Sequence, residues 1–290
     1  MAEHLQYRGK YMYVNFRNML KEAYSSHQAI GSFNWYNFET LAGIADAAEK
    51  LHSPVIVSFG AKYLSNMSLE TAVALAKAVA KEHSVPICLH LDHCSDKLTV
   101  LKAIDLGFGS VMYDGSKLSF DDNVMNTKDI CDIAHDSNVT VEAELGSLAA
   151  SESSHEGSAD DKEIYTSAED AAKFIRYTGV DALAVSIGTV HGMYKGTPNI
   201  RTDILAEINE AAGIPLVLHG GSGTPEDKLI ECINCGISKI NVNTEISEYV
   251  ISRTREYLET EHPHYSVLSL KQREWAQEVV EKYIRLFENN

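Results

Sequence analysis

The chain of 290 residues carries 25 Lys and Arg against 41 Asp and Glu, a formal net charge of −16. This negative charge excludes a protein that binds nucleic acid through its phosphates or docks on an anionic membrane surface. Hydrophobic residues make up 44% of the chain, with 18 Gly and 6 Pro, so it can bury a sizeable core and is neither disordered nor fibrous in composition.

The N-terminal segment has no apolar stretch of the kind that a secretory signal needs, because Glu3, His4 and Arg8 interrupt it. Elsewhere the longest apolar runs fall far short of the roughly 20 residues that cross a bilayer. We therefore expect a soluble, cytoplasmic protein.

Five cysteines, an odd number without framework spacing, also favour a reducing compartment. They are Cys88, Cys94, Cys131, Cys232 and Cys235. Cys232 and Cys235 form a C-x-x-C, but they lie in a helical pattern and no second pair completes a tetrahedral zinc site. We expect buried or inert thiols.

Short apolar runs rich in β-branched residues alternate with helical patterns along the chain, which predicts a parallel sheet. The expected strands are Ala29–Phe33, Pro54–Phe59, Pro86–Leu91, Ser110–Tyr113, Thr140–Leu145, Ala182–Ile187, Pro215–His219 and Lys239–Val242. The expected helices between them include residues 37–51, 68–83, 97–107, 120–137 and 167–179.

Eight strand–helix units without a linker or a shift in composition predict one (β/α)8 barrel over residues 1–290, a single domain. A doubly wound sheet is the alternative. Residues 147–166 are rich in Ser, Ala, Gly and acidic residues and too long for an ordinary turn, so we expect a mobile loop, a candidate lid over the barrel mouth. The stretch from Tyr265 to Phe287 is helical by pattern and lies beyond the eighth unit.

Three histidines, His93, His191 and His219, follow three of the expected strands, and a barrel would bring them to one rim. Three imidazoles leave a fourth position open, as in catalytic zinc sites. Each histidine alone would be taken as an ordinary, partly buried side chain; their shared placement at strand ends favours metal binding. His90 alternates with Asp92 inside a strand, so we expect it in the core.

Asp92 immediately precedes the first candidate ligand, where a general acid or base would be needed. The alternative is that it orients a histidine. The turn Gly220–Gly223 and the pair Asn243–Thr244 follow the last two strands, where barrels commonly bind phosphate. Other polar residues at strand ends are Asn34, Glu142, Glu144 and Asn241, and Gly192 and Lys195 follow His191.

Together these motifs resemble the class II, zinc-dependent ketose-bisphosphate aldolases, the family of fructose- and tagatose-bisphosphate aldolases. The resemblance runs from about Tyr13 to the end of the chain. The motifs that carry it are HLDHCS (90–95), SVMYDGS (110–116), VEAELG (141–146), IGTVHGMYKG (187–196), PLVLHGGSG (215–223) and KINVNTE (239–245).

The resemblance implies one Zn²⁺ per subunit on His93, His191 and His219, with Glu144 as an additional candidate ligand. It implies that Asp92 transfers the proton and Asn241 holds the enediolate as a phosphorylated ketose is cleaved to dihydroxyacetone phosphate and an aldehyde. The residues implied to bind the substrate and its phosphate are Asn34, Gly192, Lys195, Gly220, Ser222, Asn243 and Thr244. It also implies a monovalent cation, Na⁺ or K⁺, and a homodimer or homotetramer.

Three departures from the family pattern concern catalysis and substrate. Glu152 aligns with a catalytic glutamate on the mobile loop, but the surrounding residues differ. Many members carry a serine where this chain has Gly60. The Asp-Pro-Arg segment whose arginine reaches a distal phosphate is absent, and neither Lys271 nor Arg273 stands in matching context. We therefore expect a ketose 1-phosphate whose far end is uncharged or carries another group, in preference to a 1,6-bisphosphate.

Other functions remain compatible with the fold. A fructose- or tagatose-1,6-bisphosphate aldolase is the first alternative, and a non-catalytic sugar-phosphate-binding subunit is the second. A metal-dependent hydrolase or a phosphosugar isomerase or epimerase is a third, since this barrel hosts many chemistries.

Overall fold

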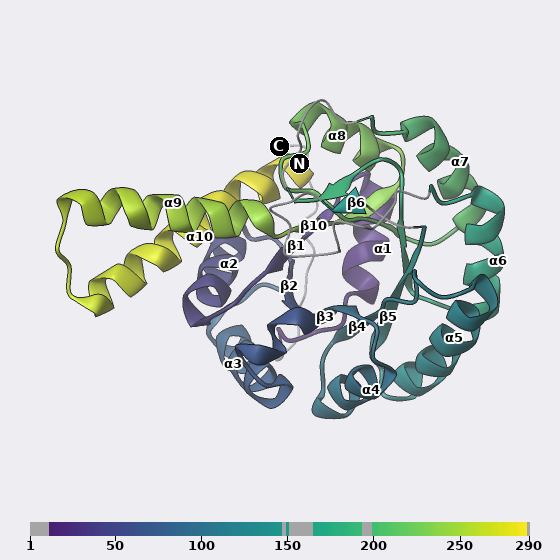
Figure 1. Ribbon diagram of the computed structural model, residues 1–290, viewed down its shortest axis with the longest axis horizontal. Helices are drawn as coiled ribbons and strands as arrows, with labels where there is room; N and C mark the ends of the chain where they lie inside the picture. The colour runs from purple at the N-terminus through teal and green to yellow at the C-terminus, as the bar shows by residue number, and fades with distance from the viewer. Residues whose placement is uncertain (1–11, 147–148, 151–164, 193–198, 289–290) are drawn as a thin grey trace.

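The computed structural model describes residues 12–146, 149–150, 165–192 and 199–288. Eight parallel strands close into a barrel in the order β1-β10-β9-β7-β5-β4-β3-β2, and helices surround it (Figure 1). The predicted (β/α)8 fold is thus confirmed, and the doubly wound alternative is wrong because β1 pairs with both β2 and β10. That the domain spans residues 1–290 stays a prediction.

The barrel strands match the expected apolar runs to within a few residues at each end. They are β1 (Ile30–Asn34), β2 (Val55–Gly60), β3 (Ile87–Cys94), β4 (Ser110–Tyr113), β5 (Thr140–Leu145), β7 (Ala182–Val185), β9 (Leu216–Leu218) and β10 (Ile237–Val242). The strand β3 is longer than expected and includes Asp92 and His93. The sixth and seventh barrel strands, β7 and β9, end before the predicted Ile187 and His219.

The helices begin where polar side chains can cap them. Asn37, Ser68, Asp96, Ser119 and Ser167 each accept a hydrogen bond from a backbone N–H of the first helical turn. The helices are α1 (Arg17–Ser26), α2 (Phe38–Leu51), α3 (Leu69–Glu82), α4 (Lys97–Leu106), α5 (Phe120–Asp136), α6 (Ala168–Thr178), α7 (Thr202–Ala212), α8 (Glu226–Asn234), α9 (Thr244–Thr260) and α10 (Tyr265–Phe287).

Helix α1 was not among the predicted elements. It covers the amino-terminal end of the barrel. Phe16, Met19 and Leu20 are buried against inward-facing residues of the barrel strands, among them Ile56 and Val217. The helix and the residue before it thereby close the amino-terminal end of the barrel with apolar side chains. The opposite end, where the strands finish, is left to polar residues.

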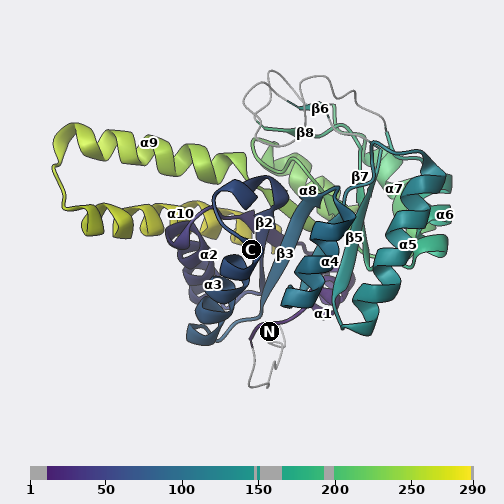
Figure 2. The same cartoon turned by 60° about the horizontal axis from the view of Figure 1, so that its bottom comes forward.

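A small two-stranded sheet lies over that opposite end, beside the barrel mouth (Figure 2). It pairs β6 (Ala149–Ala150) with β8 (Val190–His191) in parallel. The predicted loop 147–166 therefore contains a strand. Most of the predicted lid, residues 147–148 and 151–164, lies outside the described part of the chain.

Helices α9 and α10 form a hairpin arm that projects from the barrel (Figures 1 and 2). The predicted C-terminal helix is confirmed at Tyr265–Phe287, whereas the length of α9 was not foreseen. Trp275 packs between the two helices, with its ring 5.8 Å from that of Tyr257. Among the described residues, no helix has both the length and the apolar composition to cross a membrane.

The five cysteines are free thiols, and all but Cys235 are buried. Burial raises the pKa of each of them, to about 11 for Cys94 and about 12 for Cys232. The expectation of buried thiols in the C-x-x-C is confirmed for Cys232, while Cys235 is partly exposed.

Asp46 joins three helices on one side of the barrel. Its carboxylate, on α2, accepts a hydrogen bond from Arg273 Nη2 of α10 (2.7 Å) and faces His83 Nε2, just after α3 (3.3 Å). Burial opposes its ionisation, but the hydrogen bonds from His83 and Arg273 outweigh this and lower the pKa of Asp46 to about 2.

A carboxylate with a lowered pKa stabilises the fold above its unfolded-state pKa, and this stability is lost as the pH falls towards the folded value. We expect the stability advantage of the wild type over Asp46→Asn to shrink as the pH falls from about 5 towards 2. Urea unfolding of both proteins across this range measures it. If the stability difference between wild type and Asp46→Asn stays constant with pH, protonation of Asp46 is not linked to unfolding.

Candidate active site

Polar side chains gather inside the barrel at the carboxyl ends of the strands. On β5, Glu142 and Glu144 are two residues apart, so both point into the barrel, and both are buried. His219 directly follows β9 and is also buried, while His93 on β3 is partly exposed. The fold therefore brings together residues that are far apart in the sequence.

Two overlapping groups of possible metal ligands meet at His93. One consists of Asp92, His93 and His219, the other of His93, Asp114 and Glu144, and within each group the ligand atoms lie within 4.8 Å of one another. The rings of His93 and His219 are 4.5 Å apart between centroids. Two of the three predicted histidine ligands thus lie side by side.

The ring of His219 is oriented by Glu142. Its Nε2 lies 3.0 Å from Glu142 Oε1. Burial opposes ionisation of Glu142, but the charge of Lys239 and the hydrogen bond from His219 lower its pKa to about 2. Because an ionised carboxylate only accepts hydrogen bonds, Nε2 carries the proton. Burial also lowers the pKa of His219, so the neutral ring presents the Nδ1 lone pair towards Glu144 Oε2, 3.9 Å away.

His93 has an unusual backbone and a carboxylate partner. Its φ of 46° turns the chain at the end of β3, and its Nδ1 lies 3.1 Å from Asp114 Oδ2. Burial opposes protonation of the ring, but Asp92 and the hydrogen bond to Asp114 raise the pKa of His93 well above its usual value. With Nδ1 bound to Asp114, Nε2 is the nitrogen that could coordinate a metal.

Asp92 is fully buried and held by two amides. Asn34 Nδ2 donates to Asp92 Oδ2 (3.0 Å), and Asn241 Nδ2 donates to Asp92 Oδ1 (3.1 Å). Burial opposes its ionisation, but the charges of His93 and Lys239 keep the pKa of Asp92 below its usual range. The structure therefore places Asn34 and Asn241 beside the predicted proton-transfer residue.

Glu144 is a buried carboxylate at the edge of this group of ligands. Its Oε2 is buried and has no hydrogen-bond partner among the described residues. Burial and the charge of Asp114 raise the pKa of Glu144 well above its usual value. A cation between Glu144 and the two histidines would offset both the burial of the Glu144 carboxylate and its repulsion from Asp114. Imidazole nitrogen with carboxylate oxygen is a ligand set that zinc accepts. The donor set thus fits a divalent metal ion.

The predicted phosphate-binding residues of the last two strands also come together. Ser222 Oγ accepts hydrogen bonds from the backbone N–H groups of Asn243 and Glu245, both at 3.2 Å, at the amino end of α9. Thr244 begins that helix and is buried. The side chain of Asn243 contacts the hydroxyl groups of Tyr36 and Tyr63. A helix N-terminus beside a glycine turn is a favourable place for an anion.

Other predicted site residues fall partly or wholly outside the described chain. Glu152 and Lys195 are not described, and of His191 only the backbone is, in β8. Gly192 is buried and has a φ of 95°. The preceding strand β8 approaches the glycine turn, since a Cβ on Gly220 would lie 2.3 Å from the carbonyl oxygen of Val190.

Sequence reasoning missed the roles of Lys239, Glu142 and Asp114. The available signal was alternation: polar residues at every second position of an apolar strand point into the barrel. Lys239 and Asn241 on β10 follow this pattern, as do His90 and Asp92 on β3. His90 is fully buried and its Nδ1 lies 2.9 Å from Ser110 Oγ, so its predicted core position is confirmed.

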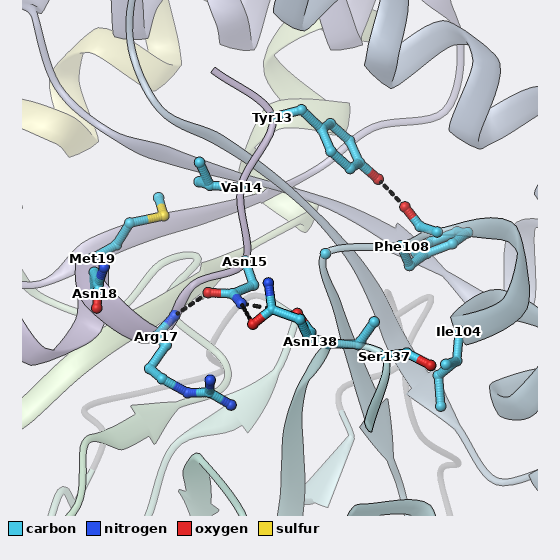
Figure 3. A pocket seen from close by; sticks show the side chains of 13 residues that line it. Tyr13, Val14, Asn15, Arg17, Asn18, Met19, Ile104, Phe108, Ser137 and Asn138 are labelled. Carbon is cyan, nitrogen blue, oxygen red and sulfur yellow. Dashed lines mark hydrogen bonds between the residues drawn. The ribbon is translucent and has the colours of Figure 1, made fainter. Parts of the chain in front are cut away.

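A cavity of about 480 Å³ lies at the opposite, amino-terminal end of the strands (Figure 3). Its lining includes Tyr13, Asn15 and Arg17, with Asn15 bonded to the carbonyl oxygen of Asn138. Arg17 is committed to an ion pair with Asp181 at 3.0 Å. This cavity contains none of the residues predicted for catalysis.

Comparisons with known proteins identify relatives of this chain. The chain is 42% identical over 234 residues to a sulfofructosephosphate aldolase of Alkalicoccus urumqiensis, covering 81% of each chain. It resembles the crystal structure of the YdjI aldolase of Escherichia coli K12, with a TM-score of 0.85, 33% identity and coverage of 95% and 97% of the two chains. A putative fructose-1,6-biphosphate aldolase of Coccidioides immitis gives a TM-score of 0.86, with 29% identity and coverage of 93% and 95%.

The model of the family described as class II fructose-bisphosphate aldolase matches residues 14–290. The chain belongs to this family, as the motifs predicted. Its structural class is therefore that of an aldolase built on a (β/α)8 barrel.

Gly220 permits a tight turn that we expect no other residue to form. It has a φ of 73°, and a Cβ there would collide with the backbone of Val190. Gly179 offers a matched control, because its φ is 72° and a Cβ would meet nothing within 4 Å.

Both alanine substitutions carry the left-handed backbone cost of about 1–2 kcal/mol, and Gly220→Ala adds the collision. We expect Gly220→Ala to lower the free energy of unfolding by at least about 1 kcal/mol more than Gly179→Ala, as measured by urea unfolding. Equal losses of unfolding free energy in the two variants would show that β8 can move away from the added Cβ without an energetic cost.

Proposed function

We propose that the protein is a zinc-dependent aldolase that reversibly cleaves a phosphorylated ketose to dihydroxyacetone phosphate and an aldehyde. The observation that carries the proposal is the grouping of Asp92, His93 and His219 at the barrel mouth. It lies at the same end of the barrel as the glycine turn and the amino end of α9. One end of the barrel thus offers ligands for a metal, a carboxylate for proton transfer and a place for a phosphate.

His93, His191 and His219 would hold the zinc ion, with Glu144 as a further ligand. When bound, zinc supplies a Lewis acid that stabilises the negative charge developing on the ketose. The unpartnered buried oxygen of Glu144 and the Nδ1 orientation of His219 support this site. A monovalent cation, Na⁺ or K⁺, is the second proposed cofactor and rests on the family alone.

Asp92 would accept the proton of the substrate hydroxyl as the carbon–carbon bond breaks. Its lowered pKa keeps it ionised, and hydrogen bonds from Asn34 and Asn241 hold the carboxylate in place. Asn241 would also hold the enediolate. Glu152 is the candidate for returning a proton to it.

The phosphate would bind at the amino end of α9, where Ser222, Asn243 and Thr244 meet. Gly192 and Gly220, both with a positive φ, would turn their backbone towards this phosphate, and Lys195 would add a positive charge. Asn34 would contact the substrate from the opposite side of Asp92. These contacts recognise one phosphate group.

We propose that the far end of the substrate carries no second phosphate. Gly60 pairs in register with Asp92, and the ring of Tyr63 lies 3.0 Å from the position that a Cβ on Gly60 would take. Tyr63 therefore fills the space where many family members carry a serine. The named relative from Alkalicoccus urumqiensis supports a fructose that carries one phosphate and a sulfo group.

The hairpin arm would serve a homodimer or homotetramer. It exposes apolar side chains, with Tyr265 76% and Leu270 59% accessible, and exposed apolar patches mark interaction surfaces. The free thiols support a reducing compartment such as the cytoplasm as the place where the protein acts.

Metal dependence and the role of Asp92 are tested together. With a ketose 1-phosphate as substrate, release of dihydroxyacetone phosphate should stop in the presence of a chelator and return with Zn²⁺. Asp92→Asn should lower kcat by about 10²–10⁴-fold, the usual contribution of a general acid or base. Asp96→Asn, an exposed cap of α4, is the control and should keep its activity. Full activity of the chelated protein would refute the proposal.

Substrate preference needs matched ketoses with the same C1 phosphate. We expect kcat/KM for a 1-phosphate bearing a sulfo group or a hydroxyl at the far end to exceed that for the 1,6-bisphosphate at least tenfold, about 1.4 kcal/mol. Steady-state cleavage assays measure this ratio. A preference for the bisphosphate of 100-fold or more would instead establish the fructose- or tagatose-bisphosphate alternative.

A further inference from the structure

Lys239 is a fully buried lysine that contacts two different parts of the site. It lies on β10 and points into the barrel, as Asn241 does two residues later. Its Nζ forms an ion pair with Glu142 Oε2 at 2.8 Å and donates a hydrogen bond to Asn241 Oδ1 at 2.7 Å. Lys239 coordinates no metal in the proposed site, and on β10 it comes two residues before Asn241.

The first contact leads to the metal site. Lys239 Nζ holds Glu142 Oε2 at 2.8 Å, and Oε1 of the same carboxylate lies 3.0 Å from Nε2 of His219. With Nε2 facing Glu142, Nδ1 is the nitrogen of His219 that could coordinate a metal. Without the lysine, Glu142 would lose the contact that fixes the plane of its carboxylate, and the ring of His219 would lose its fixed partner.

The second contact leads to the proton-transfer group. An ammonium group can only donate, so Asn241 must present Oδ1 to Lys239. This orientation points Asn241 Nδ2 towards Asp92 Oδ1, where it donates at 3.1 Å. Removing the lysine would leave the amide free to turn and place its oxygen against the carboxylate.

Fold stability alone gives no reason for a lysine at this position. Replacing a buried ion pair with apolar side chains is often neutral or stabilising, and the neighbouring strands are rich in such residues. His90 does not substitute for Lys239, because its Nε2 is 3.7 Å from Glu142 Oε2 and 4.0 Å from Asp92 Oδ1. Neither contact is a hydrogen bond.

We infer that Lys239 is a positioning residue that sets the two halves of the site at once: the ring orientation of His219 through Glu142, and the amide orientation of Asn241 beside Asp92. The inference rests on the proposed zinc site and proton-transfer role. It adds that both depend on one side chain that touches neither the metal nor the substrate.

The test separates positioning from simple charge balance. Lys239→Met leaves Glu142 buried without its cation, whereas the double variant Lys239→Met/Glu142→Gln is again neutral. We expect the single variant to lower both the melting temperature of the metal-free protein and its zinc affinity. The double variant should recover most of the melting temperature, yet its zinc dissociation constant, from competition with a chelating dye, should stay about 10–100-fold weaker than wild type.

The effect of Lys239 on the orientation of Asn241 is measured separately. At saturating zinc, both variants should show a kcat at least tenfold below wild type with KM changed less than threefold, because the phosphate-binding residues are untouched. Ser58→Ala is the matched control: Ser58 is a buried polar residue of the barrel interior that is hydrogen bonded to Ser32, outside this network. It should leave the zinc dissociation constant and kcat within twofold of wild type.

Recovery of wild-type zinc affinity in the double variant would overturn the inference, since Lys239 would then act only as a counterion. An unchanged kcat at saturating zinc would show that Lys239 is not needed to orient Asn241 beside Asp92. If the single variant does not fold, comparing the double variant with Glu142→Gln alone isolates the effect of the lysine. The zinc measurement needs no substrate, so it stands even if the wild type fails to cleave a ketose phosphate.

Discussion

Three carboxylates are buried inside the barrel, and the polar side chains around them are arranged to compensate their charge. Asp92, Glu142 and Glu144 are all nearly inaccessible to water. Isolated charges in such surroundings are strongly unfavourable, so each needs a positive partner or hydrogen-bond donors. Glu142 has Lys239 and His219, and Asp92 has two asparagine amides. Glu144 has the least compensation, and its raised pKa marks the place where a metal ion would complete the charge balance.

This arrangement explains why the two ends of the barrel differ. At the amino-terminal end, Phe16, Met19 and Leu20 seal the interior with apolar contacts and bind nothing charged. At the carboxyl end, inward-pointing polar residues of β1, β3, β5 and β10 form one connected network. Strand alternation points these polar residues into the barrel, and their position late in the strands places them at the carboxyl end, whereas inward-facing residues such as Ile56 and Val217 pack with the apolar residues of α1.

Much of the fold could be predicted from the sequence. The apolar runs located all eight barrel strands, and the pattern from Tyr265 to Phe287 predicted α10 without error. Helix α1 and the full length of α9 were missed, because their patterns sit outside the strand–helix repeat and reflect packing on the barrel end and within the arm. The strands β6 and β8 are two residues each, too short to leave a periodic signal.

Site residues could be predicted where their position at the end of a strand singles them out. Their roles could not be predicted where these depend on contacts between side chains of different strands. His93, His219 and Asp92 were found from their position, and the structure brings them together. That Asn34 and Asn241 both donate to Asp92 could not be inferred, since this requires knowing that β1, β3 and β10 converge across the barrel. Lys239 was likewise named only as the start of a strand.

The proposed chemistry depends on a divalent ion that binds between His93 and His219 at the barrel mouth. X-ray diffraction from zinc-loaded crystals, recorded on either side of the zinc absorption edge, would locate this ion. We expect a single strong anomalous peak within coordination distance of His93 Nε2 and His219 Nδ1. A crystal in which zinc occupies another position, with these two nitrogens uncoordinated, would disprove the proposed metal site.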